Sequence, residues 1–158
     1  MRKARDRLLR ALVVLALSSA LPGTPVAARD NPLADYEWSH RPLLIFAPHR
    51  SDPRVEALLH RLAMRDCELR DREIIVALLV EQGQSRMGAD LLTPDAAQAV
   101  RERFEVDPRS FTVILVGKDG GEKRRDTELP DLDAVFAQID GMPMRRDEML
   151  ARQDPCEE

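Results

Sequence analysis

Three short apolar segments dominate the hydrophobic pattern of residues 29–158, and none of them alternates regularly with polar residues. They lie at 42–47, 74–80 and 111–116. Continuous apolar runs of this length, with many β-branched side chains, are typical of strands that are buried on both faces. The pattern therefore predicts three central strands of one sheet.

Helical periodicity occupies the stretches between these predicted strands. Asp52 followed by Pro53 is a typical helix start, and the apolar residues beyond it recur with helical spacing to about Asp66. A second helix is predicted from Thr93-Pro94-Asp95 onward, and a third over 132–140 that ends at Gly141.

The remaining segments have the composition of turns and loops. Asp119-Gly120 predicts a hairpin whose second strand returns over 122–125, while residues 82–92 are polar and predict a loop or a mobile insertion. Ahead of the first strand lies a short lead-in with three side chains expected to dock on the domain, namely Leu33, Tyr36 and Trp38. The element order is then βαβ, helix, ββα. This is the order of the thioredoxin-like fold, an α/β domain with a central mixed sheet flanked by helices, although the periodicity also permits other small three-layer α/β domains.

The first 28 residues have the layout of a cleavable signal peptide. Basic residues precede the apolar run 11–21, and small residues before Ala28 suit cleavage after that residue. An uncleaved membrane anchor is the alternative, but an apolar run of eleven residues is short for a span. We therefore expect a leader over 1–28, a lead-in over 29–41, one thioredoxin-like domain over 42–141 and a C-terminal extension over 142–158. The product is expected to be periplasmic or secreted.

Removal of the leader changes the charge of the chain. The full chain has 24 basic and 28 acidic residues, whereas residues 29–158 keep 19 of the basic and 27 of the acidic ones, a net charge of −8. Such a charge argues against nucleic acid as a partner, and against attraction to anionic membranes after cleavage. The three histidines lack metal-ligand spacing, so no metal site and no cofactor are expected.

Several segments resemble one known family. Residues 41–48, Arg72-Glu73, 111–123 with its Gly-Lys-Asp-Gly-Gly run, and 139–146 with Met-Pro-Met-Arg-Arg are similar to the bacterial DUDES domain, family 4174 among the domains of unknown function. The resemblance implies a thioredoxin-like or peroxiredoxin-like fold, with related domains in vertebrate secreted matrix proteins. It implies no activity, because the bacterial family has none established.

A thioredoxin-like enzyme carries its reactive thiol in the loop after the first strand, where the helix N-terminus lowers the thiol pKa. Here that loop contains His49, Arg50 and Ser51 but no cysteine, so dithiol exchange by the usual route is excluded. These three residues could instead hold a small anion at the start of the helix. Asp52 opposes this hypothesis through its own negative charge, and its role as a plain N-cap explains the segment without a ligand. The plain cap is the favoured interpretation.

Cys67 and Cys156 are the two cysteines of the chain, and neither belongs to a CxxC motif. In an oxidising compartment they could form a disulfide that ties the tail to the domain. The alternative is a buried Cys67 with a free thiol at Cys156, and the sequence does not decide between the two. A redox relay that uses both thiols is a third, weaker hypothesis.

The segment Met142, Met144, Arg145 and Arg146 offers a second candidate surface. Exposed methionines beside arginines can form an adaptable surface for a protein partner. The favoured interpretation is that the methionines pack the chain back on the sheet while the arginines are solvated or pair with nearby acids. Taken together, the sequence predicts an exported, non-catalytic thioredoxin-fold module that binds an unidentified protein or a small anionic ligand. The alternative is a thiol-dependent oxidoreductase-related enzyme that uses Cys67 and Cys156.

Overall fold

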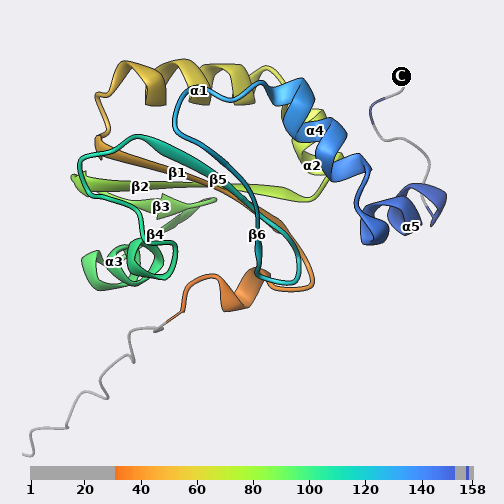
Figure 1. Ribbon diagram of the computed structural model, residues 1–158, viewed down its shortest axis with the longest axis horizontal. Helices are drawn as coiled ribbons and strands as arrows, with labels where there is room; N and C mark the ends of the chain where they lie inside the picture. Colours follow the sequence, from red (N-terminus) through yellow and green to blue (C-terminus); the bar gives the residue numbers. More distant parts are fainter. Residues whose placement is uncertain (1–30, 152–155, 157–158) are drawn as a thin grey trace, which may run out of the picture.

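The computed structural model describes residues 31–151 and Cys156, and within these residues six strands form one mixed sheet. The strands follow the order β4-β3-β2-β1-β5-β6 across the sheet (Figure 1). The predicted leader, residues 1–28, lies outside the described residues. The strands are β1 Arg41–His49, β2 Ile74–Gln82, β3 Arg86–Met87, β4 Asp90–Leu91, β5 Thr112–Val116 and β6 Glu122–Asp126.

The four longer strands pair as the predicted fold requires. β1 and β2 are parallel, β5 is antiparallel to β1, and β6 is antiparallel to β5. The three apolar runs form β1, β2 and β5, and the predicted hairpin joins β5 to β6. Gly120 in that hairpin has φ +73°, a backbone conformation that glycine adopts without steric cost. The α/β class with a central mixed sheet is thus confirmed, and the arrangement is consistent with a thioredoxin-like fold.

Helices cover both faces of the sheet (Figure 1). α1, α2 and α4 contribute buried side chains to one face, while α3 contributes to the other. Within the described residues the helices are the 3-10 helix η1 Ala34–Tyr36 and the α-helices α1 Pro53–Ala63, α2 Asp66–Asp71, α3 Pro94–Arg103, α4 Leu132–Asp140 and α5 Pro143–Ala151. None of these helices has the length and apolar character needed to cross a membrane.

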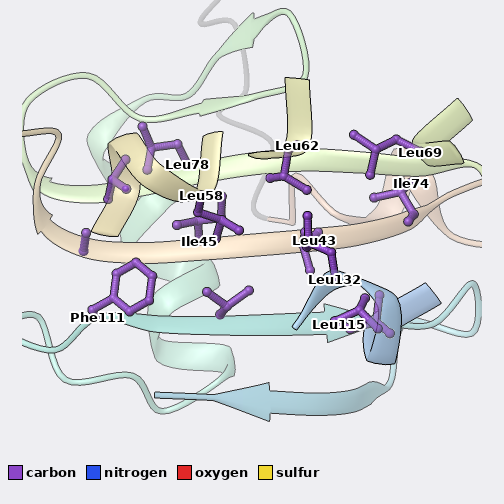
Figure 2. Close-up of a cluster of buried hydrophobic side chains, with 14 of the residues drawn as sticks. Leu43, Ile45, Leu58, Leu62, Leu69, Ile74, Leu78, Phe111, Leu115 and Leu132 are labelled. Atoms are coloured by element: carbon purple, nitrogen blue, oxygen red, sulfur yellow. The ribbon is translucent and has the colours of Figure 1, made fainter. Parts of the chain in front are cut away.

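The two-sided core explains why the central strands are apolar throughout. Leu43 and Ile45 of β1 face α1 and α4, whereas Leu44 and Phe46, their alternating neighbours, face α3. Figure 2 shows the first of these clusters, with Leu58 pointing from α1 toward β1. Both sets of side chains are removed from water, so no position in the middle of β1 can be polar.

Two expectations about secondary structure were wrong. The first helix ends at Ala63 rather than near Asp66, because Arg65 leaves helical geometry and starts the separate helix α2, which contains Cys67. The predicted loop 82–92 holds the short antiparallel strands β3 and β4, which extend the sheet beside β2. Met87, which is 1% exposed, anchors this pair in the core.

The lead-in docks only in part as predicted. Leu33 is buried and Tyr36 packs partly against the same cluster, but the Trp38 side chain is 68% exposed. Trp38 has φ +64°, and its backbone N–H donates a hydrogen bond to the carbonyl oxygen of Lys118 at 2.7 Å. The backbone of this residue therefore docks on the domain while its indole ring stays in solvent.

Candidate functional site

The C-terminal end of β1 opens into a surface cavity of about 770 Å³. Its walls come from three elements that meet where β1 and β2 end and α1 begins. The lining residues are His49, Arg50, Ser51, Val55, Glu56, Leu59, His60 and Gln82. The cavity thus occupies the position where a thioredoxin-like enzyme would hold its reactive thiol.

The three residues predicted as a ligand site, His49, Arg50 and Ser51, are all exposed at this cavity. Arg50 forms no ion pair with any residue that the structure describes, and no described carboxylate satisfies its guanidinium. A free guanidinium beside a hydroxyl and an imidazole is suited to binding a carboxylate or a phosphate group. Glu56 is the acidic residue among the lining side chains and limits the positive potential of the cavity.

The negative charge of Asp52, which argued against an anion site, is neutralised by Arg54. The Asp52 carboxylate accepts the backbone N–H of Arg54 at 2.9 Å and side-chain hydrogen bonds from Arg54 Nε at 3.0 Å and Nη2 at 2.7 Å. These side-chain hydrogen bonds hold the pKa of Asp52 below its ordinary value. Asp52 therefore caps α1 as predicted, while its charge is compensated next to the cavity.

Two further side chains at the cavity, those of His60 and Gln82, were not among the predicted site residues. Gln82 ends β2 and pairs in register with His49 at the end of β1, so the parallel pairing brings both side chains to one edge. His60 lies on α1, two helical turns beyond its start, and is exposed. The predicted parallel pairing of the first two strands could have identified Gln82, because it places the ends of both strands side by side. The position of His60 could not be predicted in this way, because it depends on how α1 crosses the sheet.

The two cysteines lie away from this cavity. Cys67 on α2 and Cys156 are joined in a disulfide with a Cα–Cα distance of 5.8 Å, across 89 residues of sequence. The sequence left this pairing open. Neither cysteine is among the residues that line the cavity, so the cavity has no thiol to activate.

A second group of charged side chains surrounds the opposite end of β1, and we call it the buried ion network. Arg41, which is 1% exposed, donates hydrogen bonds to both carboxylate oxygens of Glu148 at 3.0 and 2.9 Å. Lys118 donates to the same carboxylate at 2.6 Å and also pairs with Glu73. Among the described residues the network comprises Arg41, Asp71, Arg72, Glu73, Lys118, Asp140, Arg145 and Glu148.

The network attaches α5 to the body of the domain. Arg145 is 3% exposed, pairs with the carboxylate of Asp71 and donates from Nε to Asp140 at 3.1 Å. Burial raises the pKa of Glu148, but the hydrogen bonds and charges of Arg41 and Lys118 outweigh burial and hold it below its ordinary value. Residues 143–151 are thus a helix that the buried Arg145 and the partly buried Glu148 tie to the rest of the domain.

This placement corrects one prediction about the second candidate surface. Arg145 cannot belong to an exposed partner surface, because its guanidinium is used inside the molecule to neutralise Asp71 and Asp140. Met142 packs partly against the core, whereas Met144 and Arg146 are exposed. The four residues therefore divide between the interior and the surface instead of forming one patch.

No group of three or more His, Cys, Asp or Glu side chains within the described part of the chain is arranged to hold a metal ion. The charges that the structure brings together are organised in ion pairs or remain single at the surface.

Comparison with protein families gives one match that spans most of the chain. Residues 32–148 match the family described as "Domain of unknown function (DUF4174)". The chain belongs to this family. The matched part of this DUF4174 domain includes both the cavity at the end of β1 and the buried ion network.

Curated relatives of the DUF4174 domain are longer proteins. Coiled-coil domain-containing protein 80 of Danio rerio is 26% identical over 140 residues, which cover 78% of this chain and 16% of that protein. The Sushi repeat-containing protein SRPX of Homo sapiens is 33% identical over 126 residues, covering 75% of this chain and 26% of that protein, and its Rattus norvegicus counterpart is 32% identical with the same coverage. This chain therefore corresponds to between a sixth and about a quarter of the length of these relatives.

Proposed function

We propose that this DUF4174 domain is a non-catalytic binding module that holds a small anionic group in the cavity at the end of β1. The observation that carries the proposal is the exposed Arg50, which has no ion-pair partner among the described residues and lines a cavity with His49 and His60. An unpaired guanidinium in a concave site keeps its hydrogen-bond donors available to a ligand.

The electrostatics of the cavity support an anion more than the sequence suggested. The carboxylate of Asp52 is occupied by Arg54, so it opposes a bound anion less than a free carboxylate would. His49 and His60 add imidazole hydrogen-bonding groups to the same walls.

We further propose that the protein works outside the cytoplasm. A disulfide between Cys67 and Cys156 supports this proposal, because disulfides persist mainly in oxidising compartments. The signal-peptide layout of residues 1–28 agrees with it. The thiol-dependent oxidoreductase considered from the sequence has no comparable support, since neither sulfur lines the cavity and Cys67 and Cys156 bond to each other.

Titration calorimetry with inorganic phosphate at low ionic strength tests the binding function. The unchanged protein should bind phosphate saturably, and Arg50→Ala should weaken binding about tenfold or more, because a charge-assisted hydrogen bond contributes about 1.5–3 kcal/mol. Arg146→Ala is the matched control, since Arg146 is also exposed but lies on α5 at the far end of the sheet (Figure 1).

Equal weakening in the Arg50→Ala and Arg146→Ala variants would indicate attraction to net charge and would contradict a site at the cavity. Absence of saturable binding by the unchanged protein at both pH 6 and pH 7.5 would reject the function itself.

A further inference from the structure

Three arginines in the described part of the chain are less than 5% exposed, and one of them is paired differently from the others. Arg41 is held by Glu148 and Arg145 by Asp71, in each case with the carboxylate within hydrogen-bond distance. Arg101, which is 4% exposed, has no carboxylate that close. Its ion pair with Glu81 spans 3.7 Å and the Glu81 side chain is partly exposed, so the buried charge of Arg101 is less fully compensated than the charges of Arg41 and Arg145.

The guanidinium of Arg101 uses few of its five donors. Its Nη2 donates to the carbonyl oxygen of Leu79 at 3.2 Å, and its Nε lies 3.7 Å from Glu81 Oε2, which is beyond hydrogen-bond distance. Its Nη1 is buried and has no hydrogen-bond partner among the described residues. The carbon of the guanidinium lies 5.4 Å from the centre of the Phe46 ring, so one face of the group is covered by an apolar surface.

Arg101 also forms part of the wall of a cavity of about 290 Å³. This cavity lies between α3, the end of β2 and the segment that links β2 to β3, and it shares no lining residue with the cavity at the end of β1. The polar side chains of Ser85, Gln84 and Gln98 contribute to its walls. Ser85 and Gln84 already bond to the backbone, which fixes these two walls before a ligand arrives.

We propose that this cavity binds the carboxylate of a small organic acid, and that the Arg101 guanidinium is its binding group. A carboxylate matches the planar fork of a guanidinium and, within hydrogen-bond distance, would compensate the charge of Arg101 more fully than Glu81 does. The cavity is of a size that suits a small ligand and not a protein surface. Burial lowers the pKa of Arg101 while Glu81 and Asp107 oppose that change, which agrees with a charge that is incompletely compensated.

The acidic residues at the cavity set the charge of the ligand. Glu81 and Asp95 also line it, so the site carries more negative than positive charge before a ligand binds. Both repel a doubly charged anion such as phosphate more strongly than a singly charged carboxylate, and a carboxylate can take the place of Glu81 beside the guanidinium. The Glu81 side chain is 45% exposed, so it can turn toward solvent without losing a buried environment.

Nuclear magnetic resonance titration with sodium acetate, against sodium chloride at equal ionic strength, tests the proposal. Saturable shifts are expected at the Arg101 side-chain Nε–H and at the backbone amides of Ser85 and Gln98, and phosphate should not reproduce them. Glu81→Gln should bind acetate about fivefold more tightly, because the substitution removes a negative charge that repels acetate and competes with it for the guanidinium. Gln98→Ala, which keeps all charges, should alter affinity far less than Arg101→Lys, which loses the fork.

Two results would overturn the proposal. One is the absence of saturable, acetate-specific shifts at these three positions in both the unchanged protein and Glu81→Gln. The other is a strong destabilisation of Glu81→Gln without any gain in acetate binding, which would make Glu81 the true partner of Arg101. Repeating the titration in Arg50→Ala distinguishes this cavity from the cavity at the end of β1, because the shifts at Ser85 and Gln98 should be unchanged by that substitution.

Discussion

The two ends of β1 hold charged side chains in opposite ways. At its start Arg41 is buried and both of its terminal nitrogens bond to Glu148. Just beyond its end Arg50 is exposed, has no ion-pair partner among the described residues and lines a cavity. The two ends of one strand thus differ in function: the charge of Arg41 is neutralised inside the molecule, whereas the charge of Arg50 is available to a ligand.

This difference shows how to distinguish structural from functional charges in the domain. The segments that most clearly carry the family resemblance contain Arg41, Arg72, Lys118 and Arg145, and the structure uses all four in the buried ion network. Each is neutralised by a carboxylate from another element, so no ligand is needed to explain the presence of these charges in those segments. Arg50 at the cavity is instead a charge that no described carboxylate compensates.

The largest expected effect comes from breaking the network at Arg145. Arg145→Met removes the cation that is hydrogen-bonded to the buried carboxylate of Asp71 and leaves that carboxylate with the more distant Arg72, at 3.7 Å, so the free energy of unfolding should fall by about 3 kcal/mol or more. Chemical denaturation followed by circular dichroism measures this change. Arg146→Met on the same helix should change stability by less than about 0.5 kcal/mol, because Arg146 is exposed. Equal effects of the two substitutions would contradict a structural role for the network.

A smaller effect is expected from acid. The pKa of Glu148 is lower in the folded protein than its ordinary value of 4.5, so its ionised form stabilises the fold above that pH. This contribution is lost as the pH falls below 4.5 and through the folded pKa. The unfolding free energy should therefore fall between pH 5 and pH 3, and Glu148→Gln should show a shallower pH dependence. An identical acid slope in both proteins would exclude Glu148 as a contributor.

The smallest effect on stability is expected at the exposed end. Asp52→Asn keeps an N-cap side chain of similar quality and removes one negative charge beside the cavity, so the unfolding free energy should change by about 1 kcal/mol at most. Phosphate affinity should increase, because Arg54 is released from its carboxylate. Calorimetry and denaturation of the same samples measure both quantities. A large loss of stability here would mean that both ends of β1 are structural.

Local sequence was sufficient to predict the strands that are buried on both faces and the helices that begin with a capping residue. β1, β2 and β5 appear as apolar runs because every side chain of a two-sided strand leaves water. Asp52 and Thr93 each accept a backbone N–H of the helix that follows, as their positions before a proline indicated. The two-residue strands β3 and β4 were missed because such short segments have no periodicity to detect.

The candidate sites needed contacts between distant residues. The segment 49–51 was identified from its place at the end of the first predicted strand. The compensation of Asp52 by Arg54, which makes this segment suitable for an anion, was not predicted. Arg101 had no signal at all, since it lies among other charged residues of α3 and only the packing of α3 on Phe46 buries it.

The sequence by itself determined the order of the elements, the strands at the centre of the sheet and the absence of a thiol where a redox enzyme of this fold would need one. Those features depend on hydrophobicity, caps and residue identity, which are local properties of the chain. Tertiary structure decided which charges are buried and paired, which cysteines bond and which arginines face a cavity. These depend on how far a side chain is removed from water and on which opposite charge comes within a few ångströms, and both are set by residues tens of positions apart in the sequence.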